Sequence, residues 1–164
     1  MIENPSSLLI NSFQRNLEII ELQTDGLSHR DSLIQLPFRA NCLNWVVGHI
    51  LVNRCSVFRL LEREDLIPDL DLSRYQREAD PILKDGENVH PLSLLMETLQ
   101  QAQVQLRGHL EDLSAIDFHH PVDFFGSGEK PLIEWLFFFY FHETYHTGQT
   151  ELLRQAAGTD DKII

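Results

Sequence analysis

The segment His142-Glu143-Thr144-Tyr145-His146-Thr147-Gly148-Gln149 lies near the end of a long apolar stretch of the chain. Two histidines four residues apart lie one above the other on the same face of an α-helix. Both imidazoles can therefore reach one metal ion, as in the H-E-x-x-H pattern of zinc enzymes. A third histidine, His49, lies upstream in a second helix-like segment, Asn44-Trp45-Val46-Val47-Gly48-His49-Ile50. Three imidazoles from two helices would leave a metal position open, which is typical of a catalytic site rather than a structural one.

Apolar residues repeat every three or four positions around both segments, and this period predicts long helices. Four helices are expected, over residues 6–22, 43–63, 91–113 and 131–157. Asn41 is the expected N-cap of the second helix, and Gly158 is expected to end the fourth. Because no segment alternates at period two for the length of a strand, we expect an all-α four-helix bundle.

The connection between the second and third predicted helices is long and covers residues 64–90. Connections of more than about 12–15 residues are uncommon inside a compact domain, so this one is expected to carry a short helix or to form a lid. Residues 69–75 are the candidate for the short helix. Such a crossover would let the bundle depart from simple up-down order. The length of 164 residues fits a single domain over 1–164.

The composition excludes several classes of partner. A net charge of −12 without any basic stripe argues against a nucleic-acid surface and against binding to anionic membranes. Cys42 and Cys55 would lie about 20 Å apart along one helix, which is too far for a disulfide. Free thiols fit the reducing cytoplasm. The first residues lack the pattern of a signal peptide, and the aromatic run at 135–141 is too short to span a bilayer, so we expect a cytoplasmic protein.

The helix face that carries the histidine pair has the character of a pocket wall, because it is apolar at Trp135 and Phe139 and polar further along. Gln149 follows His146 by one turn and could accept the outer hydrogen bond that a metal-bound imidazole usually donates. The alternative is that Gln149 only forms a polar edge of the core. The predicted residues at the pocket mouth are Trp45, Asn53 and Phe139.

His49 also has two interpretations. A single histidine in an apolar helix is more often a core residue bonded to a carbonyl than a metal ligand. Gly48 beside it would let a backbone or a ligand approach closely, at a cost of about 1 kcal/mol in helix propensity. We therefore expect close packing against Gly48.

Glu143 completes a literal H-E-x-x-H motif, which suggests a metalloprotease with glutamate as general base. Those enzymes need a third ligand downstream, and none of the residues after His146 is a histidine. Glu143 is also rotated by about 100° from His142 around the helix. It could be a solvated charge or a charge between helices, and a role as base on metal-bound water is a secondary hypothesis.

Taken together, Asn44-Trp45-x-x-Gly48-His49-Ile50 and His142-x-x-x-His146-x-Gly148-Gln149 resemble the DinB-like (DinB/YfiT-like) superfamily. The resemblance covers nearly the whole chain. It implies a four-helix bundle with a long crossover between helices 2 and 3, usually as a homodimer. It also implies a divalent metal, zinc or nickel, held by His49, His142 and His146. Characterised relatives include transferases and isomerases that use a low-molecular-weight thiol such as mycothiol, bacillithiol or glutathione.

Three functional hypotheses follow. The first is a metal-dependent enzyme with a three-histidine site, a thiol-dependent S-transferase that acts on a small electrophile. The alternative is a non-catalytic stress-response module that binds a metal or a small molecule, and a fourth protein ligand such as Glu143 or a loop histidine would favour it. The weaker alternative is a metal-dependent hydrolase with Glu143 as base.

Overall fold

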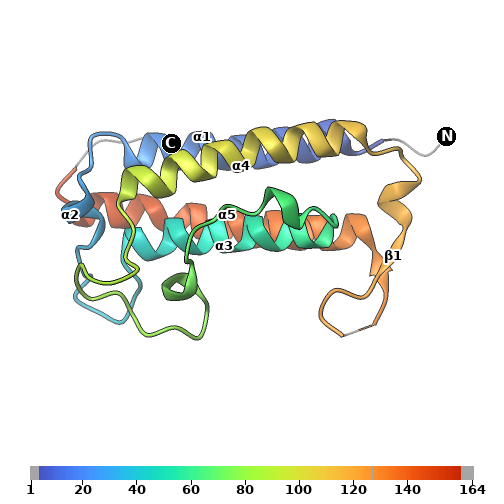
Figure 1. Ribbon diagram of the computed structural model, residues 1–164. Helices are drawn as coiled ribbons and strands as arrows, with labels where there is room; N and C mark the ends of the chain where they lie inside the picture. Colours follow the sequence, from blue (N-terminus) through green and yellow to red (C-terminus); the bar gives the residue numbers. More distant parts are fainter. Residues whose placement is uncertain (1–3, 127, 160–164) are drawn as a thin grey trace.

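Four long helices pack around one hydrophobic core in the computed structural model (Figure 1). They are α1 (Ser6–Thr24), α3 (Leu43–Leu60), α4 (Leu92–Asp112) and α5 (Leu132–Ala156). The structure describes residues 4–126 and 128–159. The prediction of an all-α bundle is confirmed, and every predicted helix begins and ends within three residues of the observed one. The period of apolar residues was a sufficient signal because each helix buries one face against the other helices.

The bundle does not follow simple up-down order. In Figure 1, α1 and α4 form one layer and α3 and α5 the other, and α3 and α4 run in the same direction. Around the bundle, α3 contacts α4 and α5, and α1 contacts the same two helices. The chain after α3 must therefore return along the length of the bundle before α4 begins. This return is the crossover that the sequence predicted.

Two short 3-10 helices interrupt the crossover, η1 (Glu64–Leu66) and η2 (Ser73–Tyr75). The short helix expected at residues 69–75 is thus one 3-10 turn at its end. Both turns pack against α3. Tyr75 is fully buried, so this part of the crossover is anchored in the core.

The remaining elements are small. The four-residue helix α2 (His29–Ser32) begins at Ser28 with a capping box. After α4, the 3-10 helix η3 (Asp117–His119) leads into an antiparallel pair, β1 (Pro121–Val122) and β2 (Lys130–Pro131). Gly126 and Gly128 adopt positive φ angles of 67° and 99° in the turn between these strands, a conformation that glycine adopts without steric cost.

One of the predicted helix ends is wrong and another is confirmed. The N-cap of α3 is Cys42, with no side-chain cap bond, instead of Asn41. The helix begins one residue too late for the Asn41 side chain to reach its first N–H groups, and Asn41 lines a cavity instead. Gly158 follows the C-cap of α5 with a φ of 90°, as expected for a glycine that ends a helix. Within the described residues, no helix has the length and apolar content that a membrane span requires.

Candidate metal centre

Three histidines from two helices converge on one point. His49 lies in the second turn of α3, and His142 and His146 lie on successive turns of α5, the helix that packs against α3. One nitrogen of each ring lies within 4.8 Å of the others. The ring centroids are 4.6–5.3 Å apart. Imidazole nitrogens that ligate one zinc ion lie about 2.0–2.1 Å from it, so the three rings would have to move slightly closer together to bind one.

The ring of His49 is oriented from the crossover. Its Nδ1 lies 2.7 Å from the backbone carbonyl of Tyr75. A carbonyl can only accept, so Nδ1 carries the proton and Nε2 has a lone pair for a metal. The Tyr75 ring packs so closely on α3 that a Cβ at Gly48 would overlap it. The close approach expected at Gly48 is thus made by the Tyr75 side chain, and it brings the Tyr75 carbonyl to His49.

Tyr75 is itself fixed by hydrogen bonds. Its hydroxyl donates to Oδ1 of Asn44 over 3.1 Å and accepts from the backbone N–H of His90 over 2.7 Å. The side-chain amide of Asn44 donates to the His90 carbonyl over 3.0 Å. These bonds join Asn44, in the first turn of α3, to Tyr75 and His90 of the crossover. The orientation of the His49 ring therefore depends on residues far from it in sequence.

The two histidines of α5 have different surroundings. Nδ1 of His146 lies 2.8 Å from Oε1 of Gln149, which fixes the proton on Nδ1 in the same way as for His49. The His142 ring has a buried Nδ1 with no hydrogen-bond partner among the described residues. Unpaired buried polar atoms are rare and need a physical account. A metal ion ligated by this ring is one such account, and imidazole ligands suit zinc, copper, iron and nickel.

Burial keeps all three imidazoles neutral at pH 7. Burial, together with the smaller effects of the nearby His146, His49 and Arg77, lowers the pKa of His142 to about 4. Burial also lowers the pKa of His49 and of His146, against the opposing effect of their hydrogen bonds to Tyr75 and Gln149. Neutral imidazole is the form that binds metals, so a metal would not have to displace protons from these rings.

A cavity of about 540 Å³ lies beside His146. Trp45 forms part of its wall and stacks on the His49 ring, with centroids 4.4 Å apart and planes at 12°. Gln149 also lines it. This volume is typical of small-molecule sites, and Trp45 is the one of the three predicted pocket residues that lines the cavity.

The other two predicted pocket residues do not line this cavity. Asn53 lies one turn beyond His49 on α3, and its amide donates to the His49 carbonyl over 2.8 Å. Phe139 is buried against Phe124 and Phe125 of the β1–β2 turn, with centroids 5.7 and 6.2 Å away. The ring of Phe139 therefore belongs to an aromatic cluster between α5 and this turn.

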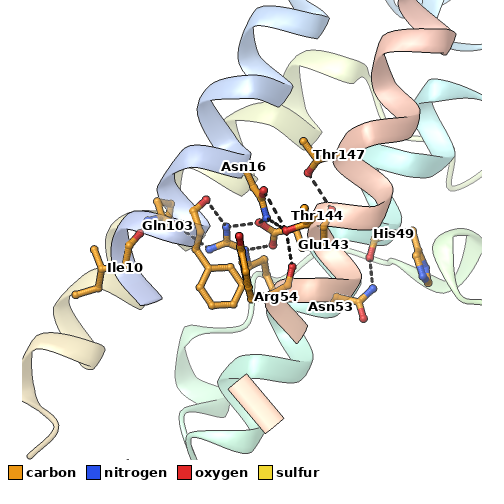
Figure 2. A network of polar contacts seen from close by, with 11 residues as sticks. Ile10, Asn16, His49, Asn53, Arg54, Gln103, Glu143, Thr144 and Thr147 are labelled. Atoms are coloured by element: carbon orange, nitrogen blue, oxygen red, sulfur yellow. Dashed lines mark hydrogen bonds and ion pairs between the residues drawn. The ribbon is translucent and has the colours of Figure 1, made fainter. Parts of the chain in front are cut away.

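Glu143 does not join the histidines. Its carboxylate accepts from two nitrogens of Arg54, including Nη2 over 2.8 Å, and both side chains are 1% exposed. Figure 2 shows this ion pair between the helices, with the His49 ring away from it. Asn16 of α1 also donates to Glu143 over 3.3 Å. Of the interpretations that the sequence left open for Glu143, the geometry matches a charge shared between helices.

Several residues of this region could not be predicted from the sequence. Arg54 also donates to Oε1 of Gln103 over 2.6 Å and to the Phe13 carbonyl over 3.2 Å, so the ion pair connects all four long helices. The available signal was an arginine in an otherwise apolar helix, which needs a buried partner. For Tyr75, the sequence indicated only that it lies in the segment 69–75, where a short helix was expected.

The comparison with family models matches residues 22–150 to the DinB superfamily. This match covers well over half of the chain and includes all three histidines, and the chain belongs to this superfamily. No curated protein matches the chain. The superfamily match and the histidine cluster place this chain in a class of helical-bundle proteins, with three histidines that could hold a metal ion.

Proposed function

We propose that this protein is a divalent-metal-dependent enzyme, a thiol-dependent S-transferase that acts on a small electrophile. The observation that carries the proposal is the convergence of three neutral imidazoles beside a cavity of about 540 Å³. In the proposed reaction the thiol sulfur forms a bond to an electrophilic carbon, the leaving group departs with its electron pair, and the thiol proton passes to solvent. Thiolate is the attacking species, so the site must favour loss of that proton.

His49, His142 and His146 would hold the metal, with zinc and nickel as the proposed ions. When bound, a divalent cation with an open position supplies Lewis acidity, which lowers the pKa of a thiol there. The chain itself contributes orientation. Tyr75 and Gln149 hold two of the rings through their Nδ1 atoms, and such outer bonds typically change metal affinity by 10- to 100-fold. The indole of Trp45 covers the His49 ring and excludes water from that side.

The geometry favours this proposal over the two alternatives. A closed structural metal site needs a fourth protein ligand, and within residues 4–126 and 128–159 no cysteine, carboxylate or further histidine joins the cluster. A hydrolase with Glu143 as base needs a carboxylate that faces the cluster. Both oxygens of Glu143 are bonded to Arg54 instead.

We also propose a cytoplasmic homodimer. The support for the cytoplasm is that Cys42 and Cys55 are both unpaired thiols. The support for a dimer is a mostly apolar groove between α1 and α5, where Leu8 and Phe137 are exposed. Exposed apolar patches of this kind mark interaction sites. Sedimentation equilibrium tests the dimer, and a monomer at the highest soluble chain concentration would refute it.

Elemental analysis of protein purified without a His-tag tests the enzyme proposal. We expect about one zinc or nickel ion per chain in the wild type and its loss in His142→Ala. His120→Ala is the matched control, because His120 is an exposed loop histidine outside the cluster. Metal-loaded protein is then assayed for consumption of thiol in the presence of small electrophiles. A wild type that takes up neither metal, even after incubation with both, would refute the proposal.

A further inference from the structure

The cavity beside His146 is apolar over most of its wall. Leu36 and Phe38 line it from the loop between α2 and α3, and Trp45 and Leu152 line it from the helices. One charged side chain is present among the lining residues, that of Arg39. This combination suits a ligand that has an apolar body and one anionic group, because ligand sites use a few placed polar groups to fix orientation.

Arg39 is available for a ligand. It forms no ion pair or hydrogen bond with the residues that the structure describes, although the chain carries 25 acidic residues against 13 basic ones. A guanidinium presents planar paired N–H donors that match the two oxygens of a carboxylate. Asn41, two residues further along the same loop, lines the same cavity and offers an uncharged amide.

A second arginine, Arg77 of the crossover, lies near the histidine cluster. Its Nε lies 3.7 Å from Oε1 of Glu78, and both side chains are exposed to solvent, so this arginine already has a counter-charge. The nearest acidic residue in sequence, Glu143, is neutralised by Arg54 on another side of α5. Arg39 is therefore the cation that the cavity wall itself offers to an anion.

We propose that Arg39 is a specificity-determining residue that binds the carboxylate of a small, largely apolar substrate in the cavity beside His146. This inference rests on the proposed function for the identity of the site, and it adds the chemical class of the ligand. The carboxylate belongs either to the thiol or to the electrophile. Because Arg39 is exposed to solvent, we expect it to increase affinity only about fivefold.

Two matched pairs of probes test the proposal. The pair 3-phenylpropionate and 3-phenylpropionamide represents an electrophile-like body, and the pair N-acetylcysteine and N-acetylcysteine amide represents a thiol. Binding is followed by NMR through the indole N–H of Trp45, in metal-free and in zinc-incubated protein. The indole N–H of Trp135 is an internal control, because it is bonded to the Val122 carbonyl near the β1–β2 turn.

In the wild type we expect the carboxylate of at least one pair to bind about fivefold more tightly than its amide, and that pair identifies the reactant. Arg39→Gln should abolish the preference and leave amide binding unchanged. Arg59→Gln removes the same charge from the far part of α3 and should preserve the preference. Equal binding of acid and amide in both pairs, or a preference that survives Arg39→Gln, would overturn the assignment. The metal-free arm gives this answer even if the protein binds no metal.

Discussion

Replacing Glu143 by glutamine separates a structural role from a catalytic one. Arg54 donates four hydrogen bonds, two to Glu143, one to Gln103 and one to the Phe13 carbonyl. The substitution leaves Arg54 buried without its counter-charge and places an amide N–H₂ against the guanidinium. Removing one partner of a buried ion pair typically costs about 3–5 kcal/mol. Because Arg54 keeps two acceptors outside the pair, we expect the lower end, about 3 kcal/mol.

For a chain of this length, 1 kcal/mol corresponds to about 2–4 °C in Tm, so Glu143→Gln should melt about 6–12 °C below the wild type. Circular dichroism of metal-free protein measures this change. Glu151→Gln removes a partly exposed carboxylate from the same helix and should change stability by no more than about 0.5 kcal/mol. Below its Tm the Glu143→Gln protein should still bind metal, since the carboxylate does not face the histidines.

A double variant tests whether the cost arises from the unpaired charge. Arg54→Met with Glu143→Leu removes both charges and replaces them with apolar side chains. Such replacements of buried ion pairs are often neutral or stabilising, so the double variant should melt above Glu143→Gln. A Tm for Glu143→Gln within 2 °C of the wild type, together with loss of metal or of activity, would refute the structural interpretation and support the hydrolase alternative.

Three further predictions concern the histidine cluster. Gln149→Ala should weaken zinc binding about tenfold, because His146 loses the acceptor for its Nδ1 proton. Chelator competition measures the affinity, the helix content should stay unchanged, and an unchanged affinity would contradict the prediction. Gly48→Ala should lower the Tm and weaken metal binding, because the added methyl group overlaps the Tyr75 ring. Such overpacking costs about 1–3 kcal/mol, which outweighs the gain of about 1 kcal/mol in helix propensity. A more stable variant would contradict this prediction. Burial and the nearby His146, His49 and Arg77 lower the pKa of His142 to about 4 in the folded chain, whereas the unfolded chain takes up the proton near pH 6.5. Metal-free protein should therefore lose stability as the pH falls between these values. Urea unfolding at pH 7 and pH 5 should show a smaller loss for His142→Gln than for the wild type, and equal losses would contradict this prediction.

The sequence was informative where a local pattern decides the structure. Residues such as Phe13, Leu17 and Ile20 repeat with the helical period and are all buried in the core, so the helices could be placed within a few residues. The pair His142 and His146 could be placed on one face for the same reason. These predictions depend only on the geometry of a single helix.

Interactions between distant segments could not be predicted in this way. Arg54 and Glu143 are 89 residues apart, and although an arginine in an apolar helix indicates a buried partner, the sequence does not identify Glu143 as that partner. Tyr75 lies in an irregular segment without periodicity, yet its carbonyl orients His49. Arg39 lies in a loop whose path depends on how α2 and α3 pack. In each case the partner is determined by tertiary packing, which periodicity does not encode.

The motif His142-Glu143-Thr144-Tyr145-His146 therefore divides between two separate structures. A step of one residue turns the side chain by about 100°, so α5 directs the two histidines toward α3 at His49 and Glu143 toward Arg54 and α1. The ion pair lies where α1, α3 and α5 meet and fixes how α5 is rotated about its axis. That rotation in turn determines whether His142 and His146 face His49. Glu143 thus acts on the metal site through helix packing, which is why its replacement should affect stability first and metal binding only once the bundle loosens.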